Sequence, residues 1–85
     1  MHTSPLVFPY RAVLHHSDGS VEVIDPLMLP VPVHVTDSAT LSIGSTTGIW
    51  RVATLEDERD HVLTADEFEN QPSYRLATVH LRQRT

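Results

Sequence analysis

The chain has 85 residues, a formal net charge of −5 and no cysteine. That length supports one modest core, so residues 1–85 are expected to form a single domain. The lack of cysteine excludes disulfides, thiolate nucleophiles and cysteine-based zinc sites. No apolar run approaches the roughly 18 residues that a membrane span needs, and the N-terminus lacks the pattern of a signal peptide. We therefore expect a cytoplasmic protein, either of the producing cell or of a host.

The N-terminal residues alternate with the period of a β-strand. Apolar side chains occupy every second position from Leu6 to Leu14, which is typical of a strand with one buried face. Pro9 indicates an edge strand or a bulge within it. Asp18 and Gly19 separate this run from a second one over 21–24, and Asp-Gly between two such runs favours a hairpin. The sequence therefore predicts an N-terminal β-hairpin.

A further alternating run extends over 27–35 and places leucine and valine side chains on one face. Pro30 and Pro32 fall on the opposite face and lack the N–H group that a strand ladder needs, so this strand is expected at a sheet edge. The run is more apolar than a small sheet needs, and it either closes the core or contacts another protein. The second interpretation makes its first residues candidates for partner binding: Leu27, Met28 and Leu29.

Two short runs, 40–43 and 49–54, flank a Gly-Ser-Thr-rich stretch over 44–48 and predict two strands joined by a loop. Trp50 lies in the second run. It is either a core residue or an exposed anchor for a partner, because exposed tryptophans often dominate interface energetics. Both interpretations are kept, and Trp50 is included among the candidate contact residues.

The charged residues that follow indicate a turn. One interpretation is a hairpin that returns through 61–63, and the other is a helix that begins at Leu55. We favour the hairpin, because Val52 and Val62 could then pair across it.

The pattern from Thr64 to Glu67 matches a capping box and predicts a short helix over 65–70, with Phe68 as its core anchor. A final strand is expected over 74–82, where apolar residues again alternate.

These patterns predict a mainly β (β-rich α+β) fold: a small antiparallel sheet or partly open barrel of five to seven strands, with one short helix near the C-terminus. Short connections between consecutive strands favour antiparallel pairing, because a parallel pair needs a long crossover.

No constellation of residues indicates catalysis, a metal site or a cofactor. The chain has six histidines, but His15 and His16 are adjacent and would point to opposite faces of a strand. No pair of histidines has the spacing that places two metal ligands together, and no Gly-x-Ser-x-Gly motif is present. We therefore expect a protein that is not an enzyme.

Charge is distributed unevenly along the chain. Seven of the eleven acidic residues lie within 56–69, whereas residues 72–85 contain three arginines and no acid. An acidic stretch can steer a basic partner. Further candidates for partner binding are therefore Glu56, Asp57, Glu58 and Asp60. Candidates for phosphate contact in the basic stretch are Arg75, His80, Arg82 and Arg84.

The sequence thus predicts a non-catalytic protein–protein interaction module, such as a small accessory, assembly or inhibitory protein of a phage or plasmid. Homo-oligomerisation through the 27–35 run is also expected, because a small chain without disulfides gains stability from a shared core. The alternative is a domain that binds or mimics nucleic acid through the arginine-rich C-terminal strand or the acidic 56–69 segment.

Overall fold

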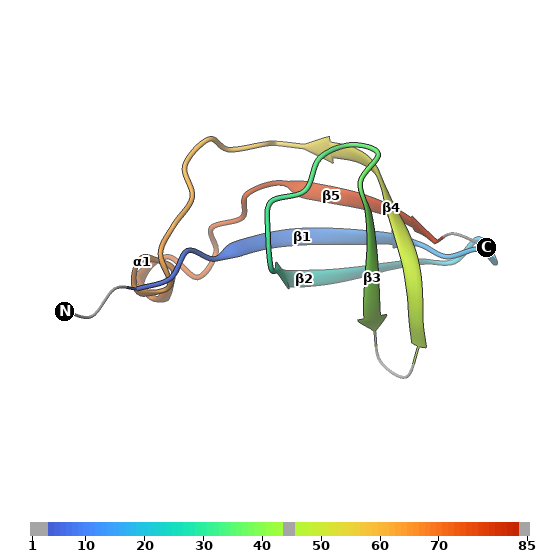
Figure 1. Cartoon of the computed structure of the whole chain (residues 1–85), viewed down its shortest axis with the longest axis horizontal. Coiled ribbons are helices and arrows are strands. Elements are labelled where there is room, and N and C mark those ends of the chain that lie inside the picture. Colours follow the sequence, from blue (N-terminus) through green and yellow to red (C-terminus); the bar gives the residue numbers. More distant parts are fainter. Residues whose placement is uncertain (1–3, 44–45, 84–85) are drawn as a thin grey trace.

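The computed structural model describes residues 4–43 and 46–83, which form one open β-sheet and one short helix (Figure 1). The strands are β1 (Phe8–His15), β2 (Val21–Leu29), β3 (Ser38–Ile43), β4 (Thr46–Glu56) and β5 (Thr78–Gln83), and the helix is α1 (Ala65–Asn70). Their order across the sheet is β2-β1-β5-β4-β3. The predicted mainly β class is therefore confirmed.

The sheet is mixed, so the prediction of an antiparallel sheet is wrong in one ladder. β5 lies parallel to β1, while the other three ladders are antiparallel. The rest of the chain, from β2 to α1, provides the long crossover that a parallel pair needs. Of the two predicted forms, a sheet or a partly open barrel, the described part of the chain forms a sheet that is not closed into a barrel and has β2 and β3 as its two edges. Figure 1 shows β3 and β4 running across the direction of β1 and β2, as expected of a strongly twisted sheet.

The N-terminal hairpin forms at the predicted turn. Gly19 has a φ of 91°, and the Asp18 carboxylate accepts a hydrogen bond from the Ser20 N–H at 2.8 Å. Hydrogen bonds from the Ser20 hydroxyl and N–H hold the pKa of Asp18 below its ordinary value. Pro9 marks neither an edge strand nor a bulge, because β1 lies between β2 and β5 and Pro9 stays in register opposite Met28. The bulge lies on β2, where two residues, Asp25 and Pro26, stand opposite Arg11.

The strand predicted over 27–35 does not form, because β2 ends at Leu29. The prolines that follow cannot donate to a ladder, and the Val33 N–H instead donates to the Tyr10 hydroxyl at 3.2 Å. The chain then turns through Thr36, whose φ is 78° and whose N–H donates to the Val52 carbonyl at 2.9 Å. Residues 30–37 therefore connect two strands instead of extending one.

The hairpin predicted to pair Val52 with Val62 is also wrong. β4 has β3 on one side and β5 on the other, so neither side is available for the residues that follow it. Val52 lies opposite Leu81 of β5. The connection after β4 is irregular and is anchored by the buried Leu63.

β4 extends further toward the N-terminus than the sequence indicated. It begins at Thr46, within the loop predicted over 44–48, and residues 44–45 lie outside the described residues. The two strands of the β3–β4 hairpin are therefore longer than predicted.

The helix α1 covers the predicted residues and begins with the predicted capping box. The Thr64 hydroxyl accepts from the Glu67 N–H at 3.2 Å, and the Thr64 N–H donates to the Glu67 carboxylate at 3.0 Å. The helix lies between β4 and β5 in chain order, rather than near the C-terminus. Phe68 is only half-buried and no helix residue is fully buried, so Phe68 is not the predicted core anchor.

Loss of the cap should have two measurable effects. We expect Thr64→Ala to lower the free energy of unfolding by about 1 kcal/mol in urea titrations, because the Glu67 N–H loses its partner. The Thr64 N–H, and then its hydroxyl, hold the pKa of Glu67 below its usual value. In Thr64→Ala this pKa should rise part of the way back, because the backbone N–H remains.

The lowered pKa of Glu67 also sets the direction in which the stability of the fold changes with pH. A carboxylate whose pKa is lower in the folded state stabilises the fold above its unfolded pKa, and this contribution is lost as the pH falls through the folded pKa. The contribution of Glu67 should therefore disappear only at a pH below the ordinary pKa of a glutamate side chain. Glu69→Gln, a control on the same helix, should leave the Glu67 pKa in place. An NMR titration in which Thr64→Ala also leaves it unchanged would contradict the capping account.

The core lies on the inner face of the curled sheet. Tyr10, Ala12 and Leu14 of β1 are buried as the alternation predicted, although Pro9, on the opposite face of the pattern, is buried as well. Alternate residues of β5 are also buried, but this strand begins at Thr78 instead of at residue 74. Leu6, which the pattern placed on the same face, precedes β1 and is exposed. The buried cluster consists of Tyr10, Ala12, Leu14, Leu29, Trp50, Val52, Leu76, Ala77, Val79 and Leu81.

Candidate interaction surfaces

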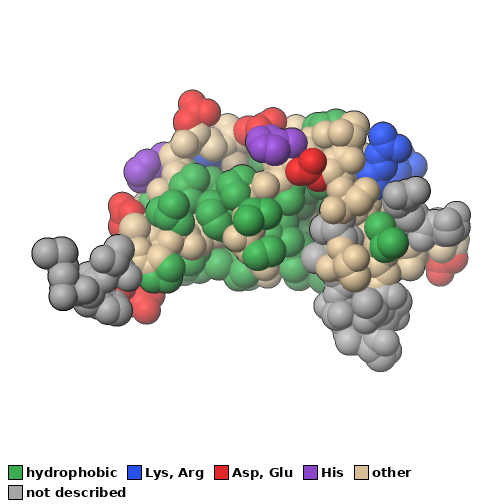
Figure 2. Space-filling model, in the orientation of Figure 1, with side chains coloured by type: hydrophobic (Ala, Val, Ile, Leu, Met, Phe, Trp, Pro, Cys, Tyr) green, Lys and Arg blue, Asp and Glu red, His purple; other side chains and the backbone are tan. Residues whose placement is uncertain are grey.

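The connection between β2 and β3 leaves valine side chains uncovered. Val31 is 58% exposed and Val35 is 49% exposed, while Val33 between them is half-buried against the core. Figure 2 shows hydrophobic side chains gathered over β1, β2 and the segment that follows β2. We call Val31, Val33 and Val35 the valine surface. A group of exposed apolar side chains marks a contact site more often than a single one does.

A groove of about 330 Å³ adjoins the valine surface. Its lining residues come from the 29–33 segment and from the start of β3: Leu29, Pro30, Val31, Val33, Asp37, Ser38 and Thr40. Ile49 lies directly opposite Thr40 in the β3–β4 ladder and is 47% exposed. Because opposed residues of a ladder share a face, Ile49 extends the apolar area onto β4.

The other predicted apolar contacts lie mainly in the core. Trp50 is 1% exposed, and its ring meets the His16 ring edge-on with centroids 5.2 Å apart. Leu29 is buried and Leu27 is half-buried against the core. Trp50 is therefore a core residue and not an exposed anchor. Met28 is exposed, on the face of β2 opposite to Leu29.

The predicted acidic residues are all exposed but differ in their contacts. Glu56, at the end of β4, contacts the His80 imidazole on the outer face of the sheet. Asp57 lines a second groove, described below. Glu58 and Asp60 are exposed on the connection between β4 and α1. These four carboxylates therefore have different surroundings, and their binding of a partner stays a prediction.

Three side chains form a hydrogen-bonded chain across the outer face. His15 Nε2 lies 3.1 Å from His80 Nδ1, the two rings stack with centroids 5.4 Å apart, and His80 Nε2 contacts the Glu56 carboxylate. The residues come from β1, β5 and β4, so only the parallel β1–β5 pairing brings the histidines together. Sequence reasoning missed this cluster because it did not foresee that pairing.

The hydrogen bonds between His15, His80 and Glu56 orient the two imidazole rings. No serine or threonine hydroxyl in the described residues donates to either ring. No group of three or more histidine and carboxylate side chains within 4–43 and 46–83 could hold a metal ion.

Some of the residues considered for nucleic-acid contact already contact carboxylates within the protein. Arg75 pairs with the Asp25 carboxylate and His80 with Glu56, while Arg82 is exposed on β5. Arg84 lies outside the described residues. Two of the three described candidates thus contact a carboxylate.

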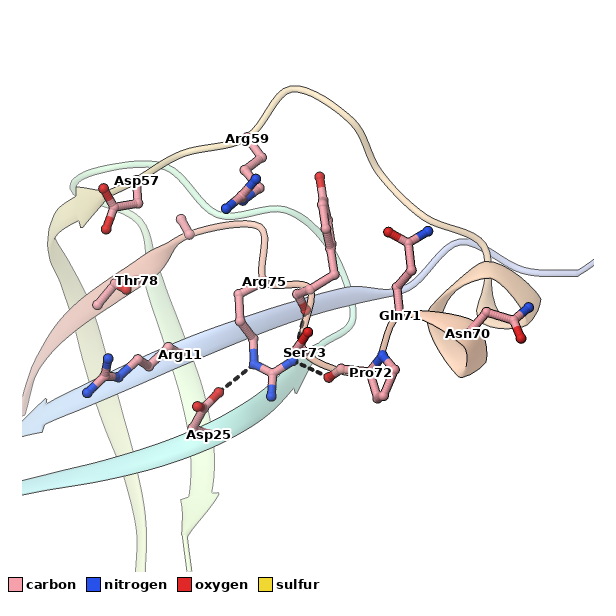
Figure 3. Close-up of a pocket in the computed structure, with 12 residues that line it drawn as sticks. Arg11, Asp25, Asp57, Arg59, Asn70, Gln71, Pro72, Ser73, Arg75 and Thr78 are labelled. Carbon is pink, nitrogen blue, oxygen red and sulfur yellow. Dashed lines mark hydrogen bonds and ion pairs between the residues drawn. The ribbon is translucent and has the colours of Figure 1, made fainter.

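A second groove, of about 570 Å³, gathers arginines that are distant in sequence (Figure 3). Arg11 of β1, Arg59 of the connection after β4 and Arg75 before β5 all line it, together with Asp25 and Asp57. Arg11 and Arg59 had no role in the sequence-based site. Arg11 belongs to no charge run or motif, and Arg59 lies within an acidic run of which only the carboxylates were candidates.

Comparison with protein families, curated proteins and solved structures finds no match to this chain. Among the described residues, no helix has both the length and the apolar character needed to cross a membrane.

Proposed function

We propose that the protein is a non-catalytic interaction module that binds another protein through the valine surface. A small accessory, assembly or inhibitory protein, of the kind that phages and plasmids encode, would have this role. The observation that carries the proposal is the exposure of two valines of one short segment, Val31 and Val35, together with the groove that Val31 and Val33 line.

Covering this surface is energetically favourable because buried apolar area contributes roughly 25 cal/mol per Å². The backbone limits how a partner can approach. Pro30 and Pro32 have no N–H to donate, so a continuous added strand would lack ladder bonds along this segment. The partner is therefore expected to pack its side chains against the valines and the groove.

A second copy of the same chain is one such partner. An 85-residue chain without cysteine has a small core and no disulfide to reinforce it, and a shared apolar interface adds stability to such domains. We therefore include homo-oligomerisation through the valine surface in the proposal.

Binding or mimicry of nucleic acid has weaker support. Neutralising phosphates requires available cations, yet Arg75 and His80 each contact a carboxylate. The acidic residues of the 56–69 segment also have different partners: Glu56 contacts His80, and Glu67 accepts a hydrogen bond from the Thr64 N–H. Neither charged segment offers one uniform face.

The experiment compares which partners the native protein and two variants with an added charge capture from cell extract. Val31→Arg should abolish recovery of a defined, nuclease-resistant partner from cell extract, because the partner would have to bury an unpaired guanidinium. The matched control is Val21→Arg, since Val21 is equally exposed, at 58%, at the other end of β2. It should retain the partner.

Two outcomes would refute the proposal. Recovery of nuclease-sensitive material alone would favour the nucleic-acid alternative. Equal capture by Val31→Arg and native protein would show that the partner binds elsewhere on the molecule.

A further inference from the structure

The arginine-lined groove has the chemistry of an anion site, although the whole chain carries a net charge of −5. Three arginines from separate parts of the fold line it: Arg11, Arg59 and Arg75. Figure 3 shows their side chains extending from β1, from the connection after β4 and from the segment before β5. Long-range folding, rather than a local run of charge, creates this concentration of guanidinium groups.

Arg75 forms part of the groove wall. Its Nε donates to the Asp25 carboxylate, and its Nη1 donates to the Pro72 and Tyr74 carbonyls at 2.6 and 2.8 Å. The dashed lines in Figure 3 mark contacts of this side chain. Because Asp25 balances its charge, Arg75 fixes the shape of the groove more than it attracts an anion.

Arg59 is held in position without a carboxylate. Its backbone N–H donates to the Leu76 carbonyl at 2.8 Å, and its guanidinium carbon lies 5.5 Å from the centroid of the Tyr74 ring. The Tyr74 hydroxyl in turn donates to the His61 carbonyl, which fixes the ring. A guanidinium stacked on an aromatic face keeps its N–H edges available for hydrogen bonds.

Arg11 supplies a second cation from the sheet. Its backbone N–H donates to the Ala77 carbonyl at 3.1 Å, which fixes its position on β1. Neither Arg11 nor Arg59 makes an ion pair with any carboxylate in the described part of the chain. Asp25 is paired with Arg75, so the lining of the groove has two arginines without an ion pair and one further carboxylate, Asp57.

We propose that this groove binds a small molecule that carries a phosphate monoester. A phosphate group has up to two negative charges near neutral pH, and guanidinium N–H pairs match its oxygens in a bidentate fashion. The remaining lining can hydrogen-bond the rest of the ligand, with Asp57 as an acceptor for hydroxyl or amine groups and with Asn70, Gln71, Ser73 and Thr78. The volume of about 570 Å³ lies within the range of small-molecule sites.

Titrations followed by two-dimensional ¹H–¹⁵N NMR test the site. Inorganic phosphate and glycerol 3-phosphate are the phosphate probes, and acetate is the carboxylate probe. Both phosphate probes should give saturable shifts confined to the groove residues, and acetate should bind at least about tenfold more weakly because it has one charge. Acetate binding as tight as phosphate binding would overturn the assignment of the ligand class.

Three variants distinguish a site from general charge attraction. Arg59→Gln and Arg11→Gln should each weaken phosphate binding by about tenfold or more, since each removes a charged hydrogen-bond donor. The matched control is Arg51→Gln, an exposed arginine of β4 outside the groove, which should change binding by less than about twofold. If Arg59→Gln perturbs the fold, Arg11→Gln decides the result.

The proposal fails if the shifts do not saturate, or if they spread over the whole surface. It also fails if Arg51→Gln weakens binding as much as the two groove variants do. Neither result depends on whether the valine surface binds a protein, because the two surfaces share no lining residue.

Discussion

Trp50→Ala is expected to lower the free energy of unfolding by about 3–5 kcal/mol, the usual cost of removing a buried aromatic side chain. Trp50 is 1% exposed and belongs to the cluster formed by β1, β4 and β5. Its removal takes away apolar burial and leaves a cavity that rigid strands cannot collapse to fill. Small domains have about 5–15 kcal/mol of stability, so this single change could remove most of it.

The neighbouring residue provides the control. Ile49 precedes Trp50 in β4 and is 47% exposed, so Ile49→Ala should cost less than about 1 kcal/mol. Urea unfolding followed by circular dichroism measures both variants. Loss of a cooperative transition in Trp50→Ala alone would agree with the account, whereas equal costs for both variants would show that Trp50 is not a core residue.

Local signals predicted the parts of the fold that depend on neighbouring residues. Asp18 and Gly19 specify a turn through their own backbone preferences, and the capping box at Thr64 defines the start of α1. The alternation in β1 also indicated which side chains enter the core. In each case the physical cause lies within a few residues of the element that it determines.

Pairing between distant strands could not be read in the same way. β1 lies parallel to β5, about 65 residues later in the chain, and no local pattern reports this choice. The stacking of His15 on His80 and the placement of Arg11 in the same groove as Arg59 both depend on it. For this reason the sequence identified neither the histidine chain nor the arginine-lined groove.

The 27–35 run shows how two local rules can compete. Alternation favoured a strand, whereas Pro30 and Pro32 removed the N–H groups that a strand needs. The prolines prevailed, and β2 ended at Leu29. As a result, the same valines that the pattern placed on one strand face lie on a connection, where Val31 and Val35 are exposed.

Val31→Arg is expected to convert an associated protein into a monomer. A guanidinium buried in an apolar interface loses its hydration without gaining a partner. The free-energy cost of this desolvation exceeds the free energy that a small interface gains from apolar burial. Val21→Arg introduces the same charge at an equally exposed valine outside the valine surface and should leave association unchanged. Circular dichroism should show that both variants keep the fold, because neither residue is buried.

Sedimentation equilibrium over a wide concentration range tests the proposed interface most directly. The native protein and Val21→Arg should approach at least twice the 9.5 kDa chain mass as concentration rises, while Val31→Arg should remain at the mass of one chain. A native protein that stays monomeric at the highest concentrations, or a Val31→Arg variant that associates as the native protein does, would contradict the account.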